Sequence, residues 1–269
     1  MLKNSLLVKE NTFKSMNEII GINKSVYFIA GPCSVESKEQ IETIAETLAK
    51  NDVHILRGGT FKPRTSPYDF QGYGEKALKM LKDAGKKHSI MIISEVMDSE
   101  DIDVFCEYAD ILQVGSRNMT NFSLLKKLGK LDMPILLKRG MMSTYNEFLL
   151  AAEYLALEGN NKIIMCERGI RTFETNTRNT LDIAAVACLK SETSLPVIVD
   201  ISHSLGRKDI VLPITKASIM AGANGIMLEV HLDPVNAKSD NMQQLNFDEF
   251  QIYIDEIKKF IKYMEMMNN

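Results

Sequence analysis

One cysteine, one histidine and two carboxylates have the residue types of a metal centre, although they lie far apart in the chain. They are Cys33, His203, Glu229 and Asp240. Thiolate, imidazole and carboxylate groups together suit iron, manganese, zinc or cobalt. His231 is a rival ligand, because residues two apart on a strand face the same way and it follows Glu229 at that spacing. Each residue taken alone also fits a simpler interpretation, since a buried cysteine is often just a small core residue.

A second group of residues is basic, and each member follows an apolar segment. The group is Arg57, Lys62, Arg64, Arg117, Lys138 and Arg168. Arg presents a fork that matches phosphate or carboxylate oxygens, and Lys adds a point charge. Six cations are more than one phosphate needs. We therefore expect two anionic substrates, or one phosphate and one carboxylate. The alternative is a chance collection of basic loops, but the formal net charge of -3 makes the concentration more informative.

Both groups must be positioned by eight short apolar runs, which alternate with amphipathic segments. The runs have the continuous apolarity of buried parallel strands. They span residues 26–31, 54–59, 90–96, 110–116, 134–140, 162–169, 195–203 and 225–231. Helices are expected between them, for example over 37–50, 121–131 and 146–159, and a last one over 247–267. This alternation predicts an α/β fold, a single (β/α)8 TIM barrel; the alternative is an open doubly wound sheet.

The barrel prediction brings the two groups together. Active sites of such barrels lie at the carboxyl ends of the strands, and the first, seventh and eighth strands are neighbours in a closed barrel. Residues 26–269 show no compositional break and are expected to form one catalytic barrel. Residues 1–25 are too short for a domain and are expected to form an N-terminal extension that caps the amino-terminal end of the barrel.

Composition excludes several classes of protein. With 269 residues, 45% hydrophobic and 25% charged, the chain is not disordered. A net charge of -3 argues against nucleic-acid binding. No run of about 18 apolar residues exists, which argues against a membrane span. The four cysteines form no Cys-x-x-Cys pair, and a cytoplasmic location without disulfides is expected.

Several longer motifs resemble those of the 3-deoxy-D-arabino-heptulosonate 7-phosphate (DAHP) synthases. The resemblance covers residues 26 to about 250 and is closest to the microbial subgroup related to 3-deoxy-D-manno-octulosonate 8-phosphate synthase. The motifs lie at residues 29–37, 57–72, 94–98, 113–119, 136–141, 166–182, 200–207 and 229–240. There are departures, such as Ile201 before Ser202-His203, where the family often has Pro. The ligand and cationic positions are all retained.

The resemblance implies a (β/α)8 transferase that condenses phosphoenolpyruvate with erythrose 4-phosphate, giving DAHP and phosphate at the first step of the shikimate route to chorismate and the aromatic amino acids. It implies a divalent metal ion, Mn, Fe, Zn or Co, held by Cys33, His203, Glu229 and Asp240. It implies that phosphoenolpyruvate is bound by Arg57, Lys62, Arg117, Lys138 and Arg168. The loop Lys62-Pro63-Arg64-Thr65-Ser66 would then receive the aldose phosphate. Pro63 favours the four-carbon aldose, since the octulosonate synthases typically carry Asn there.

The reaction also needs proton transfers. Lys62, Glu95, Glu167, His203 or a water at the metal could provide them, and Cys33, Lys62, Glu95 and His203 are the expected catalytic residues, with Glu167 and His203 also expected at the substrate. Two alternative activities remain: the octulosonate synthase reaction, and a Schiff-base phosphosugar aldolase with Lys138 as nucleophile.

A homodimer or homotetramer is expected, and a separate regulatory chain is an alternative source of control. Because only 25 residues precede the first expected strand, no feedback domain is expected in this chain. Phenylalanine, tyrosine, tryptophan and prephenate are therefore expected not to inhibit it.

Overall fold

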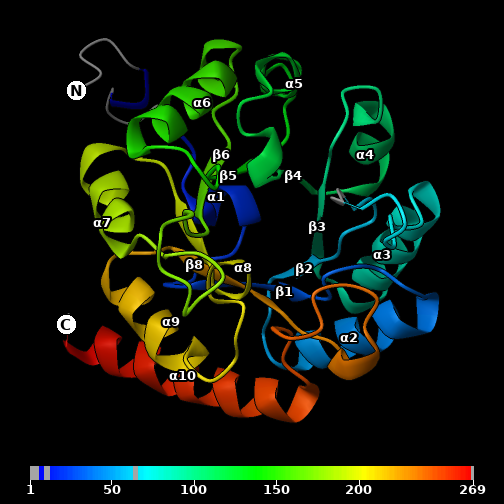
Figure 1. The fold of residues 1–269 in the computed structure, drawn as a ribbon. Coiled ribbons are helices and arrows are strands. Elements are labelled where there is room, and N and C mark those ends of the chain that lie inside the picture. Colours follow the sequence, from blue (N-terminus) through cyan, green and yellow to red (C-terminus); the bar gives the residue numbers. More distant parts are fainter. Residues whose placement is uncertain (1–5, 9–12, 63–65, 268–269) are drawn as a thin grey trace.

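The barrel predicted from the eight apolar runs is confirmed. A computed structural model describes residues 6–8, 13–62 and 66–267. Eight parallel strands close into a ring in chain order, with β1 paired to both β2 and β8 (Figure 1). The strands are β1 (Tyr27–Gly31), β2 (Ile55–Arg57), β3 (Met91–Glu95), β4 (Ile111–Val114), β5 (Ile135–Lys138), β6 (Ile163–Glu167), β7 (Val197–Asp200) and β8 (Gly225–Glu229).

Most of the helices surround the strands on the outside of the ring, whereas the short α8 lies near its centre in this view (Figure 1). They are α2 (Lys38–Lys50), α3 (Glu75–His88), α4 (Ile102–Tyr108), α5 (Phe122–Gly129), α6 (Tyr145–Leu157), α7 (Ile183–Glu192), α8 (Ile201–Leu205), α9 (Val211–Met220) and α10 (Phe247–Met267). Short 3-10 turns occur at η1 (Leu6–Val8), η2 (Ser116–Asn118) and η3 (Pro234–Asn236). Within the described residues, none of the helices is both long and apolar enough to cross a membrane.

The seventh strand is shorter than predicted. A strand was expected over 195–203, but β7 ends at Asp200 and His203 lies in the short helix α8. The reason is local: the Asp200 side chain accepts a hydrogen bond from the His203 backbone nitrogen at 3.1 Å and so caps the helix. Gly206, with φ of 68°, then ends it in the left-handed conformation.

Two sets of side chains point into the barrel, because side chains alternate between its inside and its outside along each strand. An apolar set fills the interior: Ile29, Ile55, Ile93, Ile111, Leu136, Ile164, Ile198 and Met227. A second set, here called the mouth set, lies two residues further along each strand. It consists of Gly31, Arg57, Glu95, Gln113, Lys138, Cys166, Asp200 and Glu229. The interior therefore changes from hydrocarbon to charge within one step of the strand repeat.

The short helix α1 (Met16–Ile20) closes the apolar end of the barrel. Its buried side chains Met16 and Ile20 belong to the same cluster as the apolar set. Ser15 and Glu18 form a reciprocal capping box that begins the helix. In Figure 1 this helix lies behind the ring of strands, seen through its centre. The opposite end, where the strands finish, is left for the polar residues.

Candidate active site

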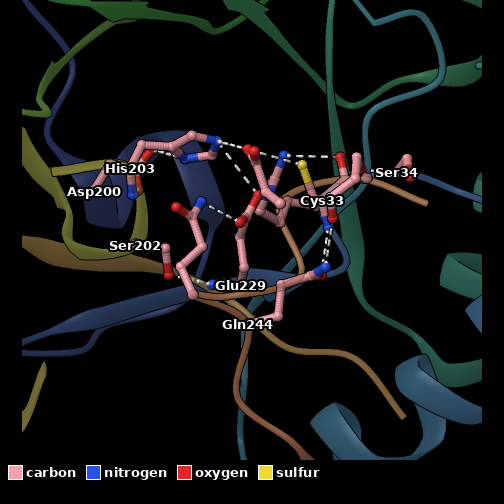
Figure 2. Close-up of polar contacts among 12 residues, drawn as sticks. Cys33, Ser34, Asp200, Ser202, His203, Glu229 and Gln244 are labelled. Carbon is pink, nitrogen blue, oxygen red and sulfur yellow. Dashed lines mark hydrogen bonds and ion pairs between the residues drawn. The ribbon is translucent and has the colours of Figure 1, made fainter. Parts of the chain in front are cut away.

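The structure brings Cys33, His203, Glu229 and Asp240 together at the mouth of the barrel. Their ligating atoms all lie within 4.8 Å of one another. Cys33 Sγ is 3.4 Å from Asp240 Oδ2, and His203 Nε2 is 3.4 Å from Glu229 Oε1 and 3.7 Å from Asp240 Oδ2. Figure 2 shows the Cys33, His203 and Glu229 side chains converging from three different segments. These distances suit four donors around one small cation.

The rival ligand His231 takes part in other contacts. Its Nδ1 accepts a hydrogen bond from the Asp233 backbone at 3.0 Å, and its Nε2 faces Glu36 Oε1 at 3.7 Å. Although Glu229 and His231 are two residues apart, β8 ends at Glu229, so the strand periodicity no longer applies beyond it. His231 is not part of the four-residue cluster that the described residues form.

Each ligand is held by a specific local structure. Asp200 is fully buried and lies 2.8 Å from His203 Nδ1, which leaves Nε2 to face the carboxylates (Figure 2). The Cys33 backbone nitrogen donates to Gln244 Oε1 at 2.9 Å. Asp240 has a φ of 47°, a left-handed conformation that Asp tolerates better than most residues.

A close backbone approach explains why β1 ends in glycine. Gly31 has a φ of 147°, and a Cβ atom there would lie 2.1 Å from the Arg57 carbonyl oxygen. No side chain fits in that space. The turn that carries Cys33 into the mouth of the barrel therefore requires glycine at this position.

The electrostatics of the cluster fit a divalent cation. Burial, reinforced by Glu229, raises the pKa of the Cys33 thiol to about 12. Burial also lowers the pKa of His203, against the opposing charge of Asp200, so the imidazole is neutral at pH 7. Burial would raise the pKa of both carboxylates, but neighbouring basic groups lower it. For Glu229 the lowering comes from His203 and Arg57, and for Asp240 from His203 and Arg178. Two carboxylates, a neutral imidazole and a thiol that would lose its proton on binding a cation form a ligand set for a transition metal.

Beside the cluster is a cavity of about 250 Å³ whose wall is strongly basic. It is lined by Lys62, Asp69, Glu95, Gly115, Ser116, Arg117, Lys138, Met141, Arg168, Arg178, His203 and Asp240. The Nη1 atom of Arg168 is buried and has no hydrogen-bond partner among the described residues, while its Nη2 donates to the His203 carbonyl at 3.1 Å. An unpartnered buried guanidinium donor indicates an anionic ligand.

Most of the predicted catalytic and binding residues that the structure describes reach this cavity or the cluster beside it. Those on its wall are Lys62, Glu95, Arg117, Lys138, Arg168 and His203. Arg57 lies behind the wall, where its guanidinium is ion-paired with Glu229 and its Nη2 lies 3.5 Å from the Cys33 carbonyl. Pro63, Arg64 and Thr65 lie outside the described residues. Ser66 is described but is not on the wall.

Glu167 is in a different place from the one expected. It has the strand parity of Ile163 and Met165, which pack in the outer core between strands and helices. There it forms a buried ion pair with Arg139 at 2.9 Å, and Asp182 contacts the same guanidinium at 2.9 Å. The structure therefore separates Glu167 from its neighbour Arg168, which faces the cavity.

Three residues around the site were missed in the sequence. Arg178 lines the cavity and is 3.2 Å from Asp240, Asp200 is ion-paired with Lys138 and hydrogen-bonded to His203, and Gln243 donates to Glu229. Asp200 could have been found, because it stands two residues beyond the apolar Ile198 and must face inward. Arg178 and Gln243 belong to loops and carry no periodic signal.

A closed barrel with a potential metal cluster and a basic cavity at the carboxyl ends of its strands defines a (β/α)8 enzyme for anionic substrates. This chain belongs to the DAHP synthetase I family, whose sequence profile matches residues 6–265.

Individual relatives agree with that membership. A Thermotoga maritima phospho-2-dehydro-3-deoxyheptonate aldolase is 50% identical over 250 residues, which is 93% of this chain and 74% of the relative. A Xylella fastidiosa 2-dehydro-3-deoxyphosphooctonate aldolase is 27% identical over 82% of this chain and 86% of its own length. A crystal structure of the Thermotoga maritima DAHP synthase superposes with a TM-score of 0.87 at 51% identity, covering 89% of this chain and 70% of that one.

Proposed function

We propose that this chain is a carbon–carbon bond-forming transferase that condenses phosphoenolpyruvate with erythrose 4-phosphate to give DAHP and phosphate. The similarity to a DAHP synthase at 50% identity, against 27% for an octulosonate synthase relative, supports the four-carbon aldose over the five-carbon one. The reaction belongs to the start of the shikimate route to the aromatic amino acids.

The observation that carries this proposal is the group of cations around one small cavity. Phosphoenolpyruvate has a carboxylate and a phosphate, and Arg117, Lys138 and Arg168 come from three different strand ends to face the same space. The unpartnered Nη1 of Arg168 is suited to the phosphate, because a guanidinium donates to two oxygens at once. Lys138, already ion-paired with Asp200, offers its remaining donors to an anion.

The proposed metal ligands are Cys33, His203, Glu229 and Asp240, since their donor atoms converge beside the cavity. A divalent ion held by these residues would supply Lewis acidity toward the aldehyde of the second substrate. The ion is proposed to be Mn, Fe, Zn or Co, because the set combines a soft thiolate with harder oxygen ligands.

Residues of the chain would hold the reactants and move the protons. C3 of phosphoenolpyruvate forms the new bond to the aldehyde carbon, water adds at C2, and the C2–O bond to phosphate breaks. Lys62 is the proposed proton donor to the aldehyde oxygen. Burial alone would lower the pKa of Lys62, but the nearby Cys33 raises it overall, so the amine stays protonated. Glu95 lies on the cavity wall, where its Oε2 accepts from Gln113 at 3.1 Å, and is the proposed acceptor of the proton that water loses.

The test is a phosphate-release assay that pairs phosphoenolpyruvate with a panel of aldose phosphates. We expect erythrose 4-phosphate to be preferred over arabinose 5-phosphate, with phosphate and DAHP formed in equal amounts. Preference for arabinose 5-phosphate would favour the octulosonate synthase reaction instead. Covalent trapping at Lys138 by borohydride in the presence of substrate would favour a Schiff-base aldolase.

Other sequence-based expectations stay predictions. They are the division into residues 1–25 and 26–269 and the homodimer or homotetramer. Sedimentation of the purified protein measures the oligomeric state directly.

A further inference from the structure

Gln243 is a buried amide that connects the two carboxylates of the proposed metal cluster. It is 3% exposed and lies in the loop between η3 and α10. Its Nε2 donates to Glu229 Oε2 at 2.6 Å, and its Oε1 accepts from Arg178 Nη1 at 2.9 Å. The same Arg178 atom lies 3.2 Å from Asp240 Oδ2. One amide and one guanidinium therefore join Glu229 to Asp240.

The chemistry of the partners allows only one orientation of this amide. Arg178 can only donate, and an ionised Glu229 can only accept. The amide oxygen of Gln243 must then face Arg178, and its nitrogen must face Glu229. An amide flip would place oxygen against oxygen and nitrogen against nitrogen. The network thus fixes the amide without reference to any ligand.

This orientation leaves the other oxygen of Glu229 free of the amide. Oε2 is engaged by Gln243, while Oε1 is ion-paired with Arg57 and also faces His203 Nε2 at 3.4 Å, on the side where the four donor atoms converge. Arg178 contacts Asp240 at Oδ2, the same oxygen that lies 3.4 Å from Cys33 Sγ. Gln243 and Arg178 therefore each hold one carboxylate of the cluster from a loop outside the strands.

We propose that Gln243 and Arg178 are positioning residues that orient Glu229 and Asp240 and so set the affinity of the centre for a divalent cation. This inference rests on the proposed metal centre but goes beyond it, because neither residue is a ligand. A purely structural role for these two residues would affect the stability of the metal-free fold. A positioning role changes the affinity for the metal instead. Outer partners of metal ligands affect affinity by about 10–100-fold in other proteins.

The main variant is Gln243→Met, which keeps the length of the side chain and removes both hydrogen bonds. The control is Gln251→Met on the exposed side of α10, where the native amide contacts only Asp255 at 3.1 Å among the described residues. Metal-free protein is titrated with Co²⁺, and the cobalt–thiolate absorption band reports binding at Cys33. The thermal midpoint of each metal-free protein is measured in parallel.

We expect Gln243→Met to weaken Co²⁺ binding by about 10–100-fold and Gln251→Met to leave it unchanged. Equal Co²⁺ affinity in Gln243→Met and the native protein overturns the inference and leaves the metal centre intact. Absence of cobalt–thiolate absorption in the native protein overturns the metal centre itself, and the inference with it.

Arg178→Lys provides a second test, because the Arg178 side chain is 40% exposed and its replacement disturbs little packing. Lys keeps one charge beside Asp240 but lacks the planar guanidinium that places Nη1 between Asp240 and Gln243. Weaker Co²⁺ binding with an unchanged metal-free thermal midpoint supports the proposal. If Gln243→Met does not fold, this variant decides the outcome alone, and unchanged affinity in it overturns the proposal.

Discussion

The two ends of the barrel interior are built from the same eight strands and yet have opposite character. The apolar set is fully or almost fully buried and packs with Met16 and Ile20 of α1. Two residues further along, the mouth set includes five charged side chains, and the four that are buried form two ion pairs: Arg57 with Glu229, and Lys138 with Asp200. One end stabilises the fold by hydrophobic burial, whereas the other holds charges that burial disfavours.

The difference shows that the mouth of the barrel contributes less to stability than the apolar end and carries the groups needed for chemistry. Replacing a buried ion pair by apolar side chains is often neutral or stabilising, so pairs such as Lys138–Asp200 are weak evidence for stability. Their value is that they hold charges ready for substrate and metal. Substitutions at the two ends should therefore affect different measurements, and the predictions below separate them.

The largest effect is expected at the mouth of the barrel. Cys33→Ala removes a proposed metal ligand, and we expect kcat/KM to fall by at least about 1,000-fold, equivalent to about 4 kcal/mol of transition-state stabilisation. The free energy of unfolding of the metal-free protein should change by about 1 kcal/mol or less, because one small side chain is lost. Phosphate release and denaturant unfolding measure the two quantities. Retained activity in metal-free Cys33→Ala would contradict the proposed centre.

In the apolar set we expect the reverse, a large loss of stability with little loss of activity. Ile164 is fully buried in the apolar set, so Ile164→Ala should lower the free energy of unfolding by about 3 kcal/mol, and the smaller change Ile164→Val by about 1 kcal/mol. The KM for each substrate should not change. A large loss of activity in folded Ile164→Ala would mean that the two ends are not separable.

Two of the cations predicted from the sequence should serve different substrates. Arg168→Ala should raise the KM for phosphoenolpyruvate by about 10–100-fold, because a charge-assisted pair of hydrogen bonds is lost, with a much smaller effect on the aldose. Arg64→Ala should do the opposite. Initial rates over a matrix of both substrate concentrations distinguish them, and equal effects on both substrates would count against the assignment.

The smallest effect concerns acid stability at the apolar end. Burial, assisted by Lys24, lowers the pKa of His54 from 6.5 to about 4, and its Nδ1 accepts from the Phe28 backbone at 3.1 Å. Between these pH values the unfolded chain binds a proton that folded His54 does not, so stability is lost as the pH falls from 6.5 to 4.

The matched variant is His54→Asn, whose amide oxygen can accept the same hydrogen bond but does not titrate. Because the ring is partly exposed, solvent screening weakens the effect. We expect the native protein to lose about 1 kcal/mol more unfolding free energy than His54→Asn over this pH range. Urea unfolding at pH 7 and pH 4 measures it. The same acid-induced loss in both proteins would assign the effect to other groups.

Much of the fold was predictable because its signals are local. Continuous apolar runs such as 162–169 identify buried parallel strands, and charged residues at their ends identify the mouth of the barrel. Strand parity contained more information than was used: Ile164, Cys166 and Arg168 share one face, so Glu167 had to lie on the other. Its pairing with Arg139 follows from the same alternation on the neighbouring strand.

The sequence by itself determined the eight-fold alternation, the apolar interior and the residue types at the mouth, because these depend on composition and period along short segments. Only the tertiary structure decided that Gln243 and Arg178 meet between two carboxylates. Arg178 and Gln243 are 65 residues apart, and no periodicity links their loops. Their contact exists because the chain-order arrangement of parallel strands places β6 and β8 on either side of β7, so that the loops leaving those strands converge over the same opening.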